Sequence, residues 1–411
     1  MNITKSNKLL LLTYAFSPHQ APEAFLVAKS FSKMDKYTVD VLTLNYDDLG
    51  VSIDTSINHY VEKNFGKIIR IKPPSWINKS SFNFLKYISH FPDKFSIFNN
   101  LVFKKAIDID INKYDAIITW SQSHSIHLAA LKIKKKFPKL PWIAHLSDPW
   151  ADNPFLLKYF GYRTVQKPLE KKVIKNANAL NFTTNLTRMM VMKKYPKDWI
   201  NKTYVTPHSY DLSLYNSKRE NISDNLKIAY FGNFYGPRNP LNFLKALEKI
   251  HSDDKNFFKN IFFQFIGKWI GNENWNLGNL NLPKNLVRTE KSISYIDSLK
   301  RMLGADMLLI LDAPFDISVF FPSKLVDYIG AKKPILAITP EGSCADIVRD
   351  IGGLVYSPDT LESIQNGIIA AISSLRIGKP LGKLNNINTT KFSNEFVSKQ
   401  YQLLIDQVIN R

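Results

Sequence analysis

A glycine-containing turn between a predicted strand and a predicted helix is the first stretch whose residue types could bind an anion. It reads GNFYGPRNP, residues 232–240. Glycines allow a tight turn and a close backbone approach to a ligand, and the helix that follows offers free N–H groups at its positive end. Arg238 could hold two phosphate oxygens at once. The stretch predicts a diphosphate site formed by Gly232, Asn233 and Arg238; an ordinary strand–helix turn with a surface arginine is the alternative.

A second helix start carries a lysine and an aspartate three residues apart. The stretch from 320 to 338 reads FFPSKLVDYIGAKKPILAI, and a proline before a helix suits its first turn. Lys324 and Asp327 share one helix face. A phosphate at this helix start would meet Ser323 and Lys324, and Asp327, one turn deeper, could accept hydrogen bonds from a ribose diol. The alternative is an exposed ion pair contributing a few tenths of a kcal/mol.

A third set of polar residues follows apolar strands in the first half of the chain. In PWIAHLSDPWADN, residues 141–153, His145 ends a strand and Asp148 lies in the loop after it. An interior histidine with satisfied hydrogen bonds and a turn residue before a proline are the alternatives. Weaker candidates are His124, after the preceding strand, and Gln20 and Glu23 in the loop SPHQAPEAF.

Composition limits the classes of protein that the chain can belong to. The 411 residues are 45% hydrophobic and 22% charged, which predicts a globular chain long enough for two domains. The net charge is +20, and residues 1–210 carry +16 of it, a field that favours phosphates, an anionic bilayer or nucleic acid. Cys344 is the only cysteine, so no intrachain disulfide or cysteine-based metal cluster is expected. No metal-binding motif is visible, and we expect metal-independent chemistry.

The first residues, MNITKSNKLLLLTYAF, resemble a signal peptide only superficially. The leucine run breaks at Thr13 and no small-residue cleavage site follows, so a buried first strand is the better interpretation. No apolar run reaches about 18 residues. We therefore expect a cytoplasmic protein, peripheral to the inner membrane if it meets a bilayer at all.

Apolar strands alternate with helices along the chain, which predicts parallel sheets covered on both faces. The predicted strands are 9–16, 38–44, 67–71, 115–120, 141–146, 179–183, 204–206, 226–231, 261–266, 307–311 and 334–338, and the predicted helices are 24–34, 125–137, 167–177, 239–251, 323–330, 359–374 and 394–409. Residues 209–225 are polar and aperiodic. The expected organisation is a Rossmann-like domain over 1–208, a linker over 209–225, a second such domain over 226–390, and a helix within 391–411 that returns to the first domain. Ligands of such sheets lie beyond the carboxyl ends of the strands, and we expect the two domains to face a central cleft.

Two basic segments could meet a membrane. Residues 63–105 mix lysine with aromatic residues, which favours an anionic bilayer but equally fits a packed loop and helix. The lysine run over residues 132–139 is most simply a solvated helix end.

Taken together, GNFYGPRNP, PSKLVDYIGAKKPILAI, HLSDPWADN and YVTPHSYDLSLY resemble the GT-B glycosyltransferases, most closely the retaining enzymes of family 4, over nearly the whole chain. The resemblance implies that the second domain binds a nucleotide-diphosphate sugar through Arg238, Lys324 and Asp327, and that the first binds the acceptor. It places His145 near the transferred sugar, where Asp148 could orient the ring or contact the acceptor hydroxyl. Gln20, Glu23 and His124 are assigned to the acceptor by their position in the expected cleft. Base contacts are assigned by position alone, to Lys268, Trp269, Ser292 and Ile293.

Two departures from the family pattern stand out. The family often has two glutamates eight residues apart, whereas Val319 stands eight residues before Asp327, and the loop SPHQAPEAF lacks paired glycines. The resemblance implies transfer of a sugar to a saccharide acceptor, lipid-linked, in the synthesis of a bacterial surface polysaccharide such as lipopolysaccharide. A nucleotide-sugar epimerase or hydrolase of the same fold is one alternative. A basic nucleic-acid-binding protein is another, although no recognition motif for nucleic acid is present.

Overall fold

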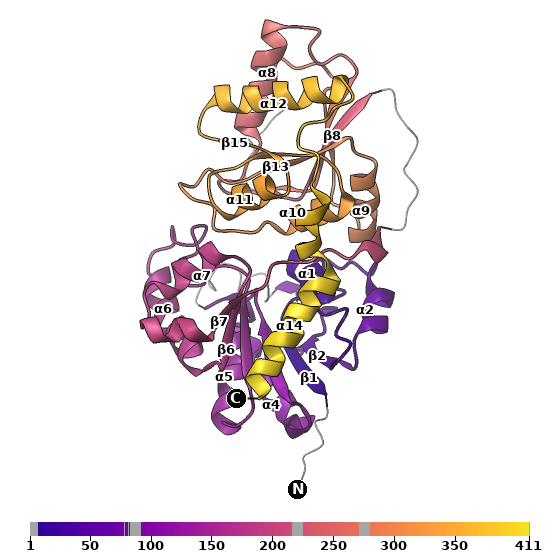
Figure 1. Ribbon diagram of the computed structural model, residues 1–411. Coiled ribbons are helices and arrows are strands. Elements are labelled where there is room, and N and C mark those ends of the chain that lie inside the picture. The colour runs from indigo at the N-terminus through magenta and orange to yellow at the C-terminus, as the bar shows by residue number, and fades with distance from the viewer. Residues whose placement is uncertain are drawn as a thin grey trace. The chain divides into compact units, whose positions relative to one another are not determined.

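The computed structural model describes residues 7–77, 79–80, 82, 92–215, 225–270 and 280–410 (Figure 1). The chain divides into two compact units. Unit 1 comprises the described residues up to Ser209 together with the segment from Asn394 onward, and unit 2 comprises Tyr210–Ser393. Residues 216–224 of the predicted linker, and residues 78, 81 and 83–91 of the predicted aromatic and basic segment, lie outside the described residues.

Unit 1 is built on a seven-stranded parallel sheet with the order β3-β2-β1-β4-β5-β6-β7. Its strands are β1 (Lys8–Thr13), β2 (Thr38–Leu44), β3 (Ile68–Ile71), β4 (Ala116–Trp120), β5 (Trp142–Leu146), β6 (Ala179–Phe182) and β7 (Thr203–Val205). In β1, five of the six residues are buried, as expected of a strand with both faces covered by helices. The register pairs Leu11 with Val41 of β2 and with Ile118 of β4.

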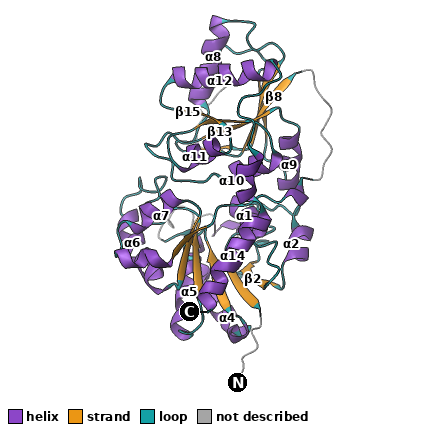
Figure 2. Cartoon of the chain, in the orientation of Figure 1, coloured by secondary structure: helices purple, strands orange, loops and turns teal. Residues whose placement is uncertain are grey.

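Helices cover this sheet (Figure 2). They are α1 (Pro22–Ser30), α2 (Asn58–Asn64), α4 (Asn99–Asp108), α5 (Ile126–Lys136), α6 (Tyr162–Asn176), α7 (Asn185–Met192) and the C-terminal α14 (Asn394–Ile409). Although α14 ends the chain, it packs beside α1 within unit 1 (Figure 1). Ser398 Oγ donates to the carbonyl of Ser30 at 2.9 Å, and Asp406 accepts a hydrogen bond from the hydroxyl of Tyr37. The C-terminal helix therefore belongs to the first unit, as the sequence predicts.

Unit 2 repeats the architecture with a six-stranded parallel sheet, in the order β12-β10-β8-β13-β14-β15. Its strands are β8 (Leu226–Phe231), β10 (Ile261–Ile266), β12 (Val287–Glu290), β13 (Met307–Leu311), β14 (Ile335–Ile338) and β15 (Leu354–Tyr356), and β9 (Phe234–Tyr235) pairs with β11 (Trp269–Ile270) apart from the main sheet. Its helices are α8 (Leu241–Asp253), α9 (Tyr295–Leu303), α10 (Ser323–Ala331), α11 (Ser343–Asp350), α12 (Leu361–Arg376) and α13 (Asn386–Thr389). In Figure 1, α8 and α12 cover one face of this sheet, and α9, α10 and α11 cover the other.

The strand orders fix where a ligand can bind in each unit. The order reverses between β1 and β4 in unit 1 and between β8 and β13 in unit 2. The loops that leave two such strands diverge to opposite faces of the sheet, which opens a crevice at the carboxyl edge. The residues that follow β8 and β13 are therefore the natural site of unit 2, and those that follow β1, β4 and β5 are the natural site of unit 1.

Candidate functional site

The carboxyl edge of unit 2 is organised by an ion pair between Arg238 and Asp312. The two side chains follow β8 and β13, and Arg238 Nη2 lies 2.8 Å from Asp312 Oδ1. Their side chains are 11% and 2% exposed. Burial alone would raise the pKa of Asp312, but the charge of Arg238 and the hydrogen bonds to the carboxylate hold this pKa below its ordinary value. The arginine at this position is thus already bonded to a buried carboxylate.

The carboxylate of Asp312 also accepts hydrogen bonds from three further donors. The hydroxyls of Ser318 and Thr339 donate to Asp312 Oδ2 at 2.7 and 3.4 Å, and the backbone N–H of Ala313 donates to Oδ1 at 2.9 Å. Thr339 directly follows β14. The carboxylate therefore ties together the ends of three neighbouring strands and fixes the orientation of Arg238.

Lys324 lies in the same region with its ammonium buried. The Nζ atom is 3.7 Å from the ring centroid of Tyr230, and a Cβ built on Gly232 would lie 2.8 Å from it. Among the described residues, no atom accepts a hydrogen bond from this ammonium. Burial, and then the charge of Arg238, hold the pKa of Lys324 well below its ordinary value. A buried amino group without an acceptor is costly, and an anion in contact with it would remove that cost.

The start of α11 adds backbone and hydroxyl donors to this region. Gly342, with φ +126°, precedes the helix, and a Cβ there would lie 2.3 Å from the carbonyl oxygen of Ser318. Only glycine fits so close an approach. Ser343 Oγ is buried, and no hydrogen-bond partner for it occurs within the described ranges. Cys344, the next residue, lies close enough to Lys324 for each group to influence the pKa of the other. Two buried donors without acceptors, Lys324 and Ser343, thus lie in one neighbourhood at the carboxyl edge of the sheet.

Asp327 is held from two sides. It is 7% exposed, and its Oδ1 accepts a hydrogen bond from the hydroxyl of Tyr295, on α9, at 2.7 Å. Its carbonyl oxygen accepts one from the hydroxyl of Tyr215 at 2.9 Å. The sequence places Asp327 one turn beyond Lys324 on α10, and the structure agrees. Its predicted role toward a ribose stays a prediction.

The remaining predicted ligands of unit 2 are spread along neighbouring loops. Asn233 is exposed, and its Oδ1 accepts a hydrogen bond from the backbone N–H of Lys268 at 2.8 Å. Trp269 packs edge-on against Phe234, with 5.6 Å between ring centroids, which brings it close to the turn after β8. The positional assignment of base contacts to Lys268, Trp269, Ser292 and Ile293 remains a prediction. Both Ser323 and Ile293 are half-buried, and Ser292 is exposed.

In unit 1, His145 is fully buried in a hydrogen-bonded network. Its Nδ1 is 3.0 Å from Asn181 Nδ2 and 2.9 Å from the hydroxyl of Tyr401, and its Nε2 is 3.2 Å from Ser147 Oγ. The ring stacks on Trp120, with centroids 3.6 Å apart. Burial is the main cause that holds the pKa of His145 well below its ordinary value, so the ring is neutral. These contacts match the interior-histidine alternative, and a catalytic role for His145 would have to act through its partners.

The partner that connects this network to a carboxylate is Ser147. Its hydroxyl is 2.9 Å from Glu23 Oε2, and the indole N–H of Trp120 donates to the same oxygen at 2.6 Å. Asn181 Oδ1 accepts from Thr206, so its NH2 group faces the ring and His145 must donate through Nε2. Burial, and then the charge of Asp148, raise the pKa of Glu23 to about 8. A carboxyl group that can hold a proton near neutral pH therefore lies at the carboxyl edge of this sheet.

The other predicted residues of unit 1 lie around this network. Asp148 is half-buried and accepts a hydrogen bond from the side chain of Gln122. His124 is 8% exposed and stacks on Trp150 with 5.1 Å between centroids. Gln20 is half-buried and its backbone N–H donates to the carbonyl of Ser52. The structure thus brings Glu23 to the His145 network, and keeps His124 in an aromatic stack.

Sequence reasoning missed four residues that build these two regions: Asp312, Ser343, Asn181 and Tyr401. A signal exists for two of them. Asp312 directly follows the apolar strand at 307–311, and a polar residue at a strand end is the pattern that identified His145. Ser343 follows a glycine at a helix start, which is the pattern that identified the turn at Gly232. No sequence signal links Tyr401 to His145, because the two residues are 256 positions apart.

The described residues contain neither a metal-binding cluster nor a membrane-spanning helix. No group of three or more His, Cys, Asp or Glu side chains within the described ranges is placed to hold a metal ion. Of the helices in that part of the chain, none has both the length and the apolarity needed to cross a bilayer.

Comparison with known proteins gives matches only among solved structures. No protein-family profile matches the chain. No curated protein sequence matches it either. HepE from Anabaena, solved in complex with UDP and glucose, is 14% identical, with a TM-score of 0.68 over 97% of this chain and 99% of that one. Sucrose-phosphate synthase from Thermosynechococcus elongatus is 13% identical, with a TM-score of 0.67 over 98% and 99%. A glycosyltransferase from Rickettsia africae is 11% identical, with a TM-score of 0.64 over 98% and 99%.

At such low sequence identity these likenesses establish the architecture alone. They extend over nearly the whole chain, and both sheets are parallel with helices on their faces. The protein has the α/β GT-B fold, with two doubly wound Rossmann-like units.

Proposed function

We propose that the protein is a glycosyltransferase that uses a nucleotide-diphosphate sugar and that unit 2 binds this donor. The observation that carries the proposal is the buried ammonium of Lys324, which lies beside Gly232 at the point where the strand order reverses and has no acceptor in the described part of the chain. Burial and the nearby charge of Arg238 lower its pKa by more than the charge of Asp312 raises it, so the free protein compensates a charge on this amino group only in part. The diphosphate of a nucleotide sugar would supply both charge and acceptors.

The neighbouring groups suit the rest of such a donor. Ser343 Oγ and the N-terminus of α11 would bond phosphate oxygens, with Arg238 held in place by Asp312. Asp327 would accept hydrogen bonds from the ribose hydroxyls. The structures of HepE with UDP-glucose and of sucrose-phosphate synthase, which share the fold, support a sugar donor of this class.

In the reaction, the bond between the sugar C1 and the diphosphate oxygen breaks, and a hydroxyl oxygen of the acceptor bonds to C1. Lys324, Arg238 and the helix start would stabilise the charge that develops on the departing diphosphate, without a metal. We propose the retaining course of the family 4 enzymes, in which the departing phosphate takes the acceptor's proton. Glu23, supported by Ser147, Trp120 and the neutral His145, would bind the acceptor side, with Asp148 beside it.

The acceptor in this proposal is a saccharide carried on a lipid, used in building a bacterial surface polysaccharide at the cytoplasmic face of the membrane. Support for this finer part is the positive charge of the first half of the chain, which carries +16 of the net +20.

A thermal-shift panel with UDP, GDP, dTDP, ADP and CMP tests the donor site. A nucleotide present at about 100 times its dissociation constant should stabilise the protein by roughly 2.7 kcal/mol, which raises the melting temperature by several degrees. Product analysis with the matching nucleotide sugar then separates transfer from epimerisation, since an epimerase needs no acceptor. Absence of any shift with all five nucleotides would refute the donor site.

Lys324→Met tests the observation that carries the proposal. Because the substitution removes an unpaired buried amino group and keeps the length of the side chain, the free protein should be as stable as the parent or more stable. Its affinity for the nucleoside diphosphate should fall by roughly 10- to 150-fold, which corresponds to about 1.5–3 kcal/mol for one charge-assisted contact. Calorimetric titration with the nucleoside diphosphate measures its affinity and, in buffers of different ionisation enthalpy, the number of protons that the protein takes up on binding.

The pH dependence of the same titration has a defined sign. The pKa of Lys324 is low in the free protein and rises when a diphosphate binds, so binding takes up protons between the two values and weakens as pH rises through that window. Lys300→Met, at an exposed lysine paired with Asp297, is the matched control and should change neither quantity. Equal affinity in Lys324→Met and the parent would remove the basis of the proposal.

Asp327→Asn tests the ribose contact. We expect weaker binding of the nucleoside diphosphate, again by roughly 10- to 150-fold, with unchanged binding of inorganic pyrophosphate, which has no ribose. Tyr295→Phe is the matched control, because it removes the internal hydrogen bond to Asp327 Oδ1 and leaves the carboxylate in place. An equal loss for both ligands would mean that Asp327 only supports α10.

A further inference from the structure

The exposed face of α6 carries a continuous row of basic side chains. Arg163, Lys167, Lys171 and Lys175 recur every four residues, which places them on one side of the helix, and Lys172 lies next to them; all five are exposed. The helix has one acidic residue, Glu170, which is fully buried and bonded to the backbone N–H of Ala151. Arg163, at the start of the row, is paired with Asp152 at 2.8 Å, so the positive charge of the outer face of α6 comes from the four lysines that follow it.

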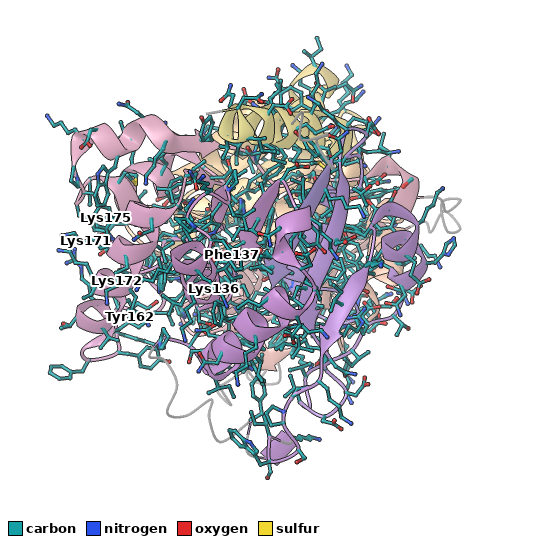
Figure 3. All side chains as sticks on the ribbon, turned by 90° about the horizontal axis from the view of Figure 1, so that it is seen from below. Lys136, Phe137, Tyr162, Lys171, Lys172 and Lys175 are labelled. Atoms are coloured by element: carbon teal, nitrogen blue, oxygen red, sulfur yellow. The ribbon has the colours of Figure 1, made fainter. Side chains whose placement is uncertain are left out.

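The adjoining helix extends this face. α5 packs against α6 and ends in a lysine-rich turn, where Lys135, Lys136 and Lys139 are exposed. Figure 3 shows Lys171, Lys172 and Lys175 along α6, with Lys136 and Phe137 of the α5 end on the same side of the view. Residues 126–140 and 154–176 together hold eleven basic residues and one acidic residue. These two segments, the α5–α6 basic face, account for much of the charge excess of the first half.

Apolar side chains are exposed beside this basic face. In the connection that leaves β5 and leads into α6, Leu157 is 46% exposed and Phe160 is fully exposed, and Val165 in the first turn of α6 is 43% exposed. An exposed phenylalanine and two exposed aliphatic residues within nine positions leave apolar surface in water without an evident structural reason. Lysines beside such side chains are the composition of surfaces that bind the interface of an anionic bilayer.

We propose that the α5–α6 basic face docks the protein on an anionic lipid surface, with Phe160 and Leu157 inserted among the acyl chains. A nucleic acid would also attract the lysines, but it offers no apolar environment for Leu157 and Val165. The connection that carries Phe160 leaves β5 at the carboxyl edge of the sheet, the edge at which Ser147 and Glu23 lie. Docking through this face would bring that edge of the sheet to the bilayer, where a lipid-linked acceptor would be accessible. This use of the docking rests on the proposed function, whereas the docking itself does not.

Sedimentation with lipid vesicles tests the docking and needs no nucleotide sugar. The protein should bind vesicles of phosphatidylcholine and phosphatidylglycerol, and bind pure phosphatidylcholine vesicles far more weakly, with a loss on raising the salt concentration. The variant K171Q/K172Q/K175Q should bind the anionic vesicles about 100-fold more weakly, since each lysine near the surface contributes about a fivefold factor. Phe160→Ser should weaken binding about tenfold with an unchanged salt dependence.

The matched control is K245Q/K249Q/K255Q, which removes the same charge from exposed lysines of unit 2 and should leave vesicle binding nearly unchanged. Melting temperatures equal to that of the parent establish that the variants are folded. The docking is refuted if neutral and anionic vesicles bind equally, or if the two triple variants lose equal affinity. Tighter binding of an oligonucleotide than of anionic vesicles, lost in K171Q/K172Q/K175Q, would also refute it and assign the face to nucleic acid. If the protein binds a nucleotide but no vesicles, the membrane docking is refuted and the proposed sugar transfer is not. If it binds anionic vesicles but no nucleotide, the proposed sugar transfer is refuted and the docking is not.

Discussion

Arg238→Ala is expected to lower the free energy of unfolding of unit 2 by about 3–5 kcal/mol. The reason is the carboxylate that the substitution leaves behind: Asp312 is 2% exposed at its side chain and has Arg238 as its ion-pair partner at 2.8 Å. Without the guanidinium, a buried negative charge loses its compensation, and the ends of β8 and β13 lose a connection. Urea unfolding followed by circular dichroism measures the loss.

Two variants decide whether the pair is the cause. Asp312→Asn in the Arg238→Ala background should recover much of the stability, because no unpaired charge remains. Arg349→Ala removes an arginine of the same unit whose partner, Glu341, is exposed, and should cost less than about 1 kcal/mol. If Arg238→Ala is as mild as Arg349→Ala, then the Arg238–Asp312 pair does not hold the strand ends together. The expected instability also means that lost nucleotide binding in Arg238→Ala would not by itself identify a ligand.

Acid is expected to destabilise unit 1 more steeply than an average domain, between about pH 6.5 and pH 4. Five of its histidines have low pKa values, mainly because they are buried: about 4 for His19, about 3 for His124 and His208, and well below the ordinary value for His127 and His145. A histidine with a lowered native pKa stabilises the fold above its unfolded pKa, and this contribution is lost as pH falls toward the native pKa.

Two carboxyl groups oppose this loss. Burial raises the pKa of Glu23 to about 8 and also raises that of Asp93, so the native state holds protons there that the unfolded state releases. With five protons taken up on unfolding and at most two given back, the net is about three. The free energy of unfolding should then fall by about 4 kcal/mol per pH unit at the steepest point. Chemical denaturation at a series of pH values measures this slope.

One variant and one control make the pH prediction specific. His124→Phe keeps the aromatic stack on Trp150 and removes one titrating group, so the slope should decrease by about 1.4 kcal/mol per pH unit. His59→Ala, at an exposed histidine, should leave the slope as it is. A slope that is the same in all three proteins would mean that the buried histidines are not its origin.

Much of the architecture could be predicted from local sequence because its signals are local. Strands β2, β8, β10 and β13 and helix α14 have the predicted bounds, since each is a short apolar run or a periodic stretch between clear turn residues. The end of α10 was also readable: Lys332 adopts a left-handed conformation, with φ 54°, and Pro334 prevents the helix from continuing.

Elements with weak local signals were missed or misplaced. α9 has nine residues and α11 has eight, so each shows its helical periodicity over little more than two turns, although α9 begins with Ser294 capping the N–H of Asp297. α6 begins five residues before the predicted start at Lys167. The additional first turn and a half is held because Tyr162 and Gln166 are buried, and Gln166 accepts a hydrogen bond from the indole of Trp150.

The sequence by itself determined the two doubly wound units, the placement of Gly232, Lys324 and Asp327 at or near strand ends and helix starts, and the charge excess of the first half. These follow from periodicity, spacing and composition, which a single chain displays directly. Only the tertiary structure decided what each charged group meets. It paired Arg238 with Asp312, left Lys324 without an acceptor in the described part of the chain, enclosed His145 with Tyr401 and brought Glu23 to Ser147. Hydrogen-bond partners and desolvation depend on residues far apart in the chain, so local spacing does not determine them.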